Sequence, residues 1–404
     1  MPDLPYGQSS QRELLTQPEM LELYRAKSSL RIGIPRETML QENRVALVPA
    51  SVTNLVARGH RIVVESGAGD KAHYSDQDYS EAGARICEDR KQVFECEILL
   101  KVAPPSHDEL SLFHPNQVLV SPLHLPVIDQ EYIQILRQKR VTAIAMEYLQ
   151  ADDGTFPIVR IMSEIAGISV VQTAAELLSN PVLGRGLLLG GISGVPPAKV
   201  VILGAGVVAE FATRAALALG ASVRIFDDNI HKLIRIQNRI GRQMYTSSLN
   251  PVTLTRQLMS ADVVIGAIHS KTGRAPLLVS EEMVMQMRPG SVIIDVSIDQ
   301  GGCIETSEVT THDHPTRVVY GVIHYGVPNI PSKVARTASI GVSNIITTIL
   351  QQAGDAGGFQ HLIYEHKGLR NGIYTYKGCL TNEYLSRRFG IKYTNLDLLL
   401  ASTI

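Results

Sequence analysis

A strand–turn–helix–strand pattern between Lys199 and Asp228 constrains the fold of this chain more than any other stretch. Apolar Val200–Leu203 is typical of a buried strand, and a turn of small residues follows it before an alanine-rich helical segment. A second strand is predicted at Ser222–Phe226, and Asp227 comes directly after it. This order of elements is the layout of a dinucleotide-binding βαβ unit.

Each small residue of the turn has its own purpose in such a unit. Gly204 permits the sharp turn, Gly206 lets the backbone approach a pyrophosphate, and Ala209 keeps helix and strand close. Val207 lies in the same turn, near the helix N-terminus, where unpaired N–H groups and the helix dipole favour phosphate. Asp227 would accept hydrogen bonds from the adenosine ribose and repel a 2′-phosphate. Helix packing alone also selects small residues, but the whole pattern predicts NAD as the cofactor.

The overall composition predicts a two-domain globular protein. A chain of 404 residues is long for a single core. Its 38 Lys and Arg residues balance its 39 Asp and Glu residues, which argues against nucleic acid or an anionic membrane as partner. A hydrophobic fraction of 45% with only 19% charged residues is typical of a well-buried enzyme.

Neither a metal site nor a disulfide framework nor an export signal is expected. The cysteines are scattered without CxxC pairs, at Cys87, Cys96, Cys303 and Cys379. His312-Asp313-His314 has no further ligand at suitable spacing and is interpreted as a loop. The N-terminal MPDLPYGQSSQRELL lacks the apolar core of a signal peptide, and no uninterrupted apolar run is long enough to span a bilayer. These features together favour a cytoplasmic protein.

Alternating β-rich and helical runs predict two α/β domains. The alternation begins at Leu30, and a long helical pattern at Ile161–Asn180 would cross to the second domain. Another strand is expected at Val318–Ile323, and a helix at Ser339–Gln352. The expected division is an N-terminal extension at 1–29, a first catalytic segment at 30–157, a Rossmann-type NAD-binding domain at 158–335 and a returning catalytic segment at 336–404.

Four side chains outside the nucleotide stretch combine reactivity with a loop or strand-end position, where α/β folds place ligands. Arg44 would hold a carboxylate in a bidentate pair, unless it is a surface arginine. His124 follows a buried strand and would be a general acid or base, or a structural histidine. Asp299 would take a proton from water or cap a turn. Lys101 would be catalytic or an edge-strand lysine.

Ordered matches along the chain resemble a known family. The chain is similar to NAD-dependent alanine dehydrogenases from Arg31 to the last helix. The matching segments are IGIPRET, ENRVALVP, VESGAG, LLKV, LHL, MSEIAG, GGISGVPPAKVVILGAG, IIDVSIDQGGC, TTHDHPT and GVIHYGVPNIPS. The resemblance implies a Rossmann-type NAD-binding domain inserted into a second α/β catalytic domain, and a homohexamer.

The resemblance also implies roles for individual residues. Arg44 would bind the substrate carboxylate, and His124 and Asp299 would form the catalytic pair. The residues implied to contact the adenosine half of NAD are Gly204, Gly206, Asp227 and Lys232, and those implied to line the cleft near the pyrophosphate and nicotinamide are Ser163 and Asn329.

A related branch of the family is the nucleotide-binding subunit of proton-translocating transhydrogenase, which shares IGIPRE, VESGAG and VPPAKV. That branch lacks the histidine at the position of His124, and it has other sequences in place of IDQGG and MSEIAG. All three features are present in this chain, and they favour the dehydrogenase branch.

The substrate pocket departs from the family pattern. Alanine dehydrogenases usually read KVKEP where this chain reads KVAPP, so Ala103 replaces a lysine that contacts the substrate oxygen. An alanine has no hydrogen bond to donate there. Lys101 lies two residues earlier and would reach the site from the same face of a continuing strand. Pro122 and Pro126 replace an aromatic and a small residue in the histidine motif.

These observations leave several hypotheses. The leading one is reversible oxidative deamination of L-alanine to pyruvate and ammonia, with a hydride passing from the α-carbon to NAD. A second keeps the reaction but changes the substrate to another amino acid or 2-oxo acid, as the pocket departures suggest. A third is a catalytically weak NAD-binding protein with a structural or sensing role, which only the missing lysine favours. A transhydrogenase-like hydride carrier is the remaining alternative.

Overall fold

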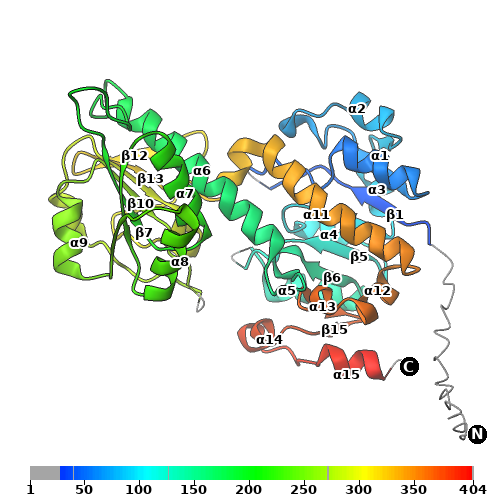
Figure 1. Cartoon of the computed structure of the whole chain (residues 1–404). Coiled ribbons are helices and arrows are strands. Elements are labelled where there is room, and N and C mark those ends of the chain that lie inside the picture. Colours follow the sequence, from blue (N-terminus) through cyan, green and yellow to red (C-terminus); the bar gives the residue numbers. More distant parts are fainter. Residues whose placement is uncertain (1–27, 40, 126, 271–272, 403–404) are drawn as a thin grey trace, which may run out of the picture.

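Two sheets covered by helices form the two halves of the molecule in the computed structural model, which describes residues 28–402 except 40, 126 and 271–272 (Figure 1). The expected extension at 1–29 therefore lies almost entirely outside the described residues, and so does Pro126. Helix α6 (Pro157–Ser179) runs from one half to the other, and α11 (Ala335–Asp355) packs against it.

The first sheet has eight strands in the order β15-β14-β6-β5-β4-β1-β2-β3. Its parallel strands are β1 (Arg31–Ile34), β2 (Arg61–Glu65), β3 (Arg85–Cys87), β4 (Ile98–Leu100), β5 (Val118–Ser121) and β6 (Thr142–Ala145). From the far end of the chain, β14 (Ile373–Tyr376) pairs antiparallel with β6, and β15 (Cys379–Leu380) pairs with β14. The chain thus returns to its first sheet after building the second, as the expected insertion requires.

Short helices surround this first sheet. They are α1 (Pro49–Ala57), α2 (Asp76–Glu81), α3 (Arg90–Phe94), α4 (His107–Ser111), α5 (Gln130–Gln138), α12 (Phe359–Glu365), α13 (Lys367–Arg370), α14 (Glu383–Phe389) and α15 (Leu396–Ala401), with 3₁₀ turns η1 (Asp70–Ala72) and η2 (Met146–Tyr148). Several begin with a side-chain cap. For example, Ser106 accepts from the Glu109 N–H while Glu109 accepts from the Ser106 N–H, which fixes the start of α4.

The second sheet has seven strands in the order β12-β13-β11-β10-β7-β8-β9. They are β7 (Lys199–Leu203), β8 (Ser222–Phe226), β9 (Tyr245–Ser247), β10 (Val263–Gly266), β11 (Val292–Asp295), β12 (Thr316–Val319) and β13 (Val322–Tyr325). Its helical elements are α7 (Val207–Ala218), α8 (Ile230–Ile240), α9 (Pro251–Leu258), α10 (Glu281–Met285), η3 (Val296–Gln300) and η4 (Ile330–Val334). All the pairings are parallel except that of β12 with β13.

The strand expected at Val318–Ile323 is wrong. The chain turns back at Tyr320-Gly321, so these residues span the end of β12 and the start of β13 in an antiparallel hairpin. Both turn residues have positive φ, 52° and 75°, as a two-residue hairpin turn requires. The sequence gives little indication of this turn, because Gly321 is the one turn-favouring residue within an apolar segment.

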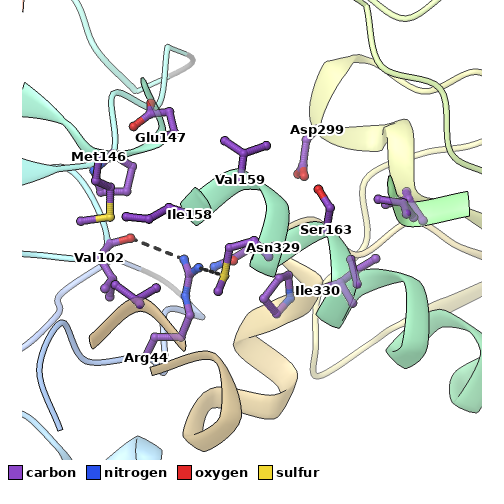
Figure 2. A pocket seen from close by; sticks show the side chains of 17 residues that line it. Arg44, Val102, Met146, Glu147, Ile158, Val159, Ser163, Asp299, Asn329 and Ile330 are labelled. Carbon is purple, nitrogen blue, oxygen red and sulfur yellow. Dashed lines mark hydrogen bonds between the residues drawn. The ribbon is translucent and has the colours of Figure 1, made fainter. Parts of the chain in front are cut away.

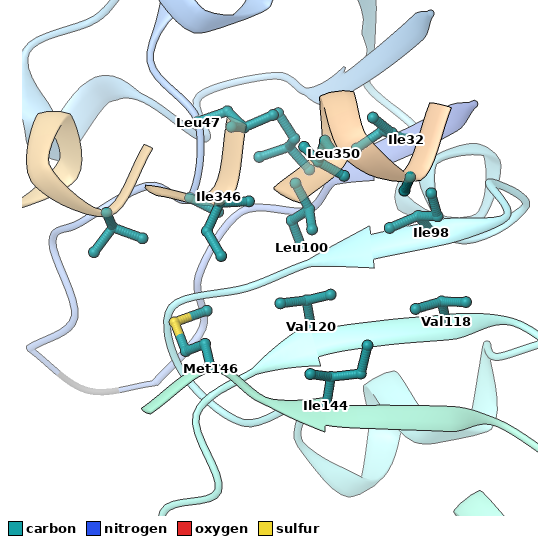
Figure 3. Close-up of a cluster of buried hydrophobic side chains, with 14 of the residues drawn as sticks. Ile32, Leu47, Ile98, Leu100, Val118, Val120, Ile144, Met146, Ile346 and Leu350 are labelled. Atoms are coloured by element: carbon teal, nitrogen blue, oxygen red, sulfur yellow. The ribbon is translucent and has the colours of Figure 1, made fainter. Parts of the chain in front are cut away.

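Both faces of the first sheet are buried, which explains its nearly continuous apolar strands. In β4, Ile98 and Leu100 face the helix α11, where Ile346 and Leu350 cover them (Figure 3). Leu99 points to the opposite face and belongs to a separate core cluster. Each such fully buried aliphatic side chain stabilises the fold by about 1.5–3 kcal/mol.

Helix α6 contains no uninterrupted apolar run long enough to span a bilayer, but by length and composition it is apolar enough to cross a membrane. Its apolar character has a packing explanation within this fold. A Cβ on Gly167 would lie 2.5 Å from the Val208 carbonyl oxygen and 2.8 Å from Phe211 Cβ, so α6 and α7 touch at close range. Ala166 and Val170 are buried at the same contact. Small and apolar residues are therefore needed where α6 crosses the nucleotide-type unit.

Candidate functional site

A cleft lies between the two sheets at the carboxyl ends of their parallel strands, the usual position for a ligand in such folds. It consists of two adjoining cavities of about 350 Å³ and about 380 Å³. The residues that line both are Arg44, Val102, Pro122, Glu147, Asp299 and Asn329. The first cavity extends along α6 to Ser163 and Val208, beside the glycine turn (Figure 2). The second is lined by Ala103 and His124.

Arg44 is oriented by Glu42, two residues before it. Its Nε donates to Glu42 Oε1 at 2.7 Å, and its Nη2 lies 2.5 Å from Glu42 Oε2. Burial opposes ionisation of Glu42, but the Arg44 guanidinium outweighs it and holds the pKa of that carboxyl below its ordinary value. The other acceptors of Arg44 are weak: Nη1 donates to Met162 Sδ at 3.3 Å, and Nη2 donates to the Val102 carbonyl at 3.4 Å (Figure 2). A substrate carboxylate would take the free N–H of Nη1 and replace these weak acceptors.

Asn329 joins the two halves at the base of the cleft. Its side-chain amide donates to Glu42 Oε2 at 2.8 Å, and its backbone N–H serves the carboxyl of Asp299. The residue has a positive φ of 53° at the start of η4, a conformation that asparagine tolerates better than most residues. The left-handed turn brings both donors to the cleft.

Asp299 lies on η3, immediately beyond β11, and keeps open surface toward the cleft. Desolvation by the surrounding protein raises its pKa to about 6, although the Asn329 N–H and the charge of Arg44 lower it. Asp295 fixes the loop, because its Oδ1 accepts from the Ser297 N–H at 3.0 Å and its Oδ2 from the Cys303 N–H at 2.9 Å. Asp299 is therefore able to exchange protons near neutral pH.

His124 lies on the loop beyond β5 and lines the second cavity. Its ring makes no hydrogen bond to any residue that the structure describes, and desolvation lowers its pKa. The imidazole is neutral at neutral pH and can accept a proton. The loop is tied to the next strand, because the Leu123 N–H donates to Glu147 Oε1 at 2.7 Å.

Lys101 does not line either cavity. Its side chain is 1% exposed, and its Nζ lies 2.8 Å from Glu37 Oε2 and 3.1 Å from Glu109 Oε1. Burial lowers the pKa of this ammonium, but the two carboxylates outweigh it and raise the pKa overall. Glu37 also accepts from the Val102 N–H at 2.7 Å. Lys101 thus supports the backbone that lines the cleft, and its contact with the substrate stays a prediction that these ion pairs do not favour.

The local backbone explains the enclosed position of Lys101. Strand β4 ends at Leu100, so the two-residue alternation that would place Lys101 and Ala103 on one face does not continue. Ala103 alone faces the second cavity, where it is 2% exposed. Pro122 lines both cavities as well, so two of the departures from the family pattern are cleft residues.

The glycine turn fits a dinucleotide. Gly204 has a φ of 109°, and a Cβ there would lie 2.4 Å from the Ala267 carbonyl oxygen, so only glycine is accommodated. A Cβ on Gly206 would meet no atom within 4 Å, which leaves open space above the turn. Gly206 is the N-cap of α7 and gives it no side-chain cap, so the first N–H groups remain available to phosphate. Val207 begins the helix, and Ala209 is fully buried beneath it.

Asp227 is only 1% exposed, so it is more buried than a residue whose one purpose is to contact a ribose. Its Oδ2 accepts from the Ala205 N–H and its Oδ1 from the Asn229 N–H, both at 2.8 Å. Each carboxylate oxygen still has capacity for a second hydrogen bond. Lys232 Nζ lies 3.5 Å from Oδ2. Arg235 donates to the Ala205 carbonyl at 3.2 Å. The fold thus places an arginine at the turn, although no arginine is adjacent to Asp227 in the sequence.

Two acidic residues of the cleft were missed by sequence reasoning. For Glu42, the sequence offers no indication of a place in the cleft other than its position two residues before Arg44. Glu147 follows the apolar strand β6 directly, as His124 follows β5 and Asp299 follows β11. The strand-end rule that selected the other two would have found Glu147 as well. No group of three or more His, Cys, Asp or Glu side chains among the described residues is arranged to hold a metal ion.

The fold and cleft together define a class of two-domain α/β proteins that bind a dinucleotide beside a small polar substrate pocket. Residues 33–166 match the family profile "Alanine dehydrogenase/PNT, N-terminal domain", and residues 170–383 match "Alanine dehydrogenase/PNT, C-terminal domain". The chain belongs to the alanine dehydrogenase/PNT family.

Characterised relatives cover most of the chain. An alanine dehydrogenase of Bacillus subtilis is 42% identical over 363 residues, 90% of this chain and 95% of that protein. An alanine dehydrogenase of Methanococcus maripaludis is 40% identical over 365 residues, 90% of this chain and 97% of that one.

Two solved structures share the whole fold. A structure of an L-alanine dehydrogenase has a TM-score of 0.83 and 39% identity, covering 88% of this chain and 98% of its own. A transhydrogenase from Sinorhizobium meliloti has a TM-score of 0.75 and 26% identity, covering 87% of this chain and 99% of its own. The dehydrogenase is thus nearer in both sequence and structure.

Proposed function

We propose that the protein is an NAD-dependent alanine dehydrogenase, which converts L-alanine reversibly to pyruvate and ammonia. The observation that carries the proposal is the meeting of Arg44, His124 and Asp299 at one cleft that extends to the glycine turn. The identity of 42% to an alanine dehydrogenase, over nine-tenths of this chain, supports the same activity.

The residues of this chain divide the work between binding and proton transfer. Arg44 would bind the substrate carboxylate, and Glu42 would keep the guanidinium in place. The glycine turn, with Asp227 and Lys232, would hold the adenosine half of NAD, and Ser163 and Asn329 would line the cleft beyond it. Bound NAD would accept the hydride that leaves the α-carbon of the amino acid.

Proton transfer would then fall to His124 and Asp299. Loss of the hydride leaves a C=N bond that water attacks, and a base must remove the proton of that water. Both groups are suited to this step, because desolvation lowers the pKa of His124 and raises that of Asp299 to about 6. The proton removed from water is then given to the amino nitrogen, which leaves as ammonia. The C=O bond of pyruvate forms as the hydroxyl gives its remaining proton to the same base.

The direct test is formation of NADH from L-alanine by the purified protein. We expect turnover that depends on NAD, and the reverse reaction from pyruvate, ammonium and NADH. The His124→Ala variant should bind NAD with unchanged affinity and lose turnover by about 10²–10⁴-fold. A protein that binds NAD but forms no NADH from L-alanine would contradict the proposal and favour a catalytically weak NAD-binding protein.

A second candidate is the same reaction on another amino acid. It is favoured by Ala103, which leaves part of the second cavity wall without a donor or charge. A screen of amino acids, and of 2-oxo acids with ammonium, distinguishes the candidates by kcat/KM. The Ala103→Lys variant belongs in the same screen, because a gain in alanine turnover would identify the missing lysine as the limiting change.

The assembly and location are also proposals. We propose a homohexamer in the cytoplasm, from the resemblance to the family. Light scattering on the purified protein would measure the mass of the assembly. Fractionation of cells that make the full chain would test its location.

A further inference from the structure

One acidic side chain of the cleft lacks a partner for half of its carboxyl group. Glu147 lies on η2, directly beyond β6, and lines both cavities. Its Oε1 accepts from the Leu123 N–H at 2.7 Å. Its Oε2 is shielded from water and accepts no hydrogen bond from the residues that the structure describes. Burial raises the pKa of this carboxyl to about 7, because a charge on the shielded oxygen is uncompensated.

Among the residues that the structure describes, no cation is paired with Glu147. The guanidinium of Arg44 is already paired with Glu42, and Lys101 is enclosed in its own ion pairs. Ala103, on the wall of the second cavity, has no charge to offer. Figure 2 shows Glu147 on the wall that carries Met146, across the cavity from Asp299. The cleft wall therefore carries an acid with one unpaired oxygen, which is enclosed and meets a ligand only when the side chain turns toward the cavity.

An α-amino acid carries two groups of opposite charge on its α-carbon, a carboxylate and an ammonium. Once Arg44 holds the carboxylate, the ammonium needs an anionic acceptor within the same cleft. Asp299 already receives the Asn329 N–H and the favourable charge of Arg44. Glu147 has no cationic partner within the described part of the chain, so an ammonium brings it a larger gain.

We propose that Glu147 binds the α-amino group of the substrate and accepts the proton that this group loses before the hydride leaves. The inference rests on the proposed function and extends it by naming the residue for the nitrogen half of the reaction. His124 and Asp299 then serve the water, and Glu147 serves the amine.

The substrate ammonium gives one proton to the Glu147 carboxylate, which leaves a neutral amine and a carboxylic acid. The nitrogen lone pair then forms the C=N bond as the hydride leaves the α-carbon, with its electron pair, for the nicotinamide of NAD. In the reverse direction the same carboxyl returns its proton to the newly formed amine.

The test is the kinetics of Glu147→Gln, which keeps the acceptor for the Leu123 N–H but cannot ionise. We expect the KM for ammonium in the reverse reaction, and for L-alanine in the forward one, to rise about tenfold or more, as for a lost charge-assisted hydrogen bond. The KM for pyruvate should change by less than about twofold, since Arg44 holds the carboxylate. The change of kcat/KM for L-alanine with pH near pH 7 should also be absent in Glu147→Gln.

Two further variants complete the experiment. Glu131→Gln removes an exposed carboxylate on α5 and should behave as the wild type. Glu147→Asp keeps the negative charge but moves it back from the cavity by one methylene. It should raise the KM for ammonium less than Glu147→Gln does. It replaces Glu147→Gln in the experiment if the glutamine variant does not fold. An unchanged ammonium KM overturns the inference, as does a parallel rise of the ammonium and pyruvate KM values with a lower Tm. A wild-type protein that does not turn over L-alanine overturns the proposed function itself, and the inference with it.

Discussion

The Asn329 amide donates to Glu42 Oε2 at 2.8 Å, although 287 residues separate the two in the chain. Glu42 uses the same oxygen to hold Arg44. Asn43 strengthens the junction, because its N–H donates to Ser332 Oγ at 2.9 Å. Arg44, beside the first sheet, is thus oriented through a carboxylate that also accepts a hydrogen bond from Asn329, beside the second sheet.

The Glu42→Gln variant tests this arrangement. Gln retains a hydrogen bond but loses the charge that pairs with the buried guanidinium, and breaking a buried pair costs about 3–5 kcal/mol. We expect the Tm to fall and the KM for both L-alanine and pyruvate to rise about tenfold or more, because both present a carboxylate to Arg44. Thermal unfolding and steady-state kinetics in both directions measure these effects.

Glu88→Gln, which changes an exposed carboxylate of the same domain, is the matched control and should leave both quantities unchanged. Equal KM values for Glu42→Gln and the wild type would show that Glu42 does not orient the substrate arginine.

The pH dependence of turnover should reveal Asp299. Its pKa is raised to about 6, so the carboxyl is mostly protonated below that pH and becomes a base above it. We therefore expect kcat/KM for L-alanine to increase as pH rises through about 6. Asp299→Asn should lower kcat by about 10²–10⁴-fold and leave NAD affinity intact. A variant that retains turnover, with the same rise through pH 6, would assign that limb to another group.

Lys101 should matter for stability rather than for substrate contact. In Lys101→Met, Glu37 and Glu109 lose their shared cation in a buried site, and uncompensated buried charge costs about 3–5 kcal/mol. We expect a lower free energy of unfolding in chemical denaturation. Lys91→Met, at an exposed position on α3, should have little effect.

The kinetics of the same variant separate two roles for this lysine. If the KM for pyruvate rises while the Tm stays at the wild-type value, Lys101 is a substrate-binding residue. A lower Tm with a small change in KM agrees with its enclosed position.

Local patterns were sufficient to predict most of the nucleotide half. The prediction of strand β8 at Ser222–Phe226 is confirmed to the residue, because a short β-prone segment between a helix and an acidic residue has clear ends. The turn with Gly204 and Gly206 was equally clear, since glycine there serves the backbone itself. Such features depend on neighbours in sequence, and the sequence contains all of them.

The substrate half was harder because its contacts join distant residues. Nothing near Glu42 in sequence indicates that Asn329 completes its hydrogen bonds. The face on which Lys101 lies depended on where β4 ends, and a one-residue difference in a strand end reverses a side chain. The partners of Glu147 depend on the fold of two separate strands. These are tertiary properties, and a periodic pattern cannot encode them.

The two glycines of the turn allow a matched test of fold against cofactor binding. A Cβ at Gly206 has open space around it, so Gly206→Ala should fold normally. The added methyl occupies the space where a pyrophosphate would approach, and we expect NAD to bind about tenfold or more weakly, about 1.4 kcal/mol. Gly204→Ala should instead destabilise the protein, because its φ of 109° and the 2.4 Å approach to Ala267 exclude a side chain. Calorimetric NAD titration and thermal unfolding of both variants measure the contrast. Equal NAD affinity in Gly206→Ala and the wild type would place the pyrophosphate elsewhere than over this turn.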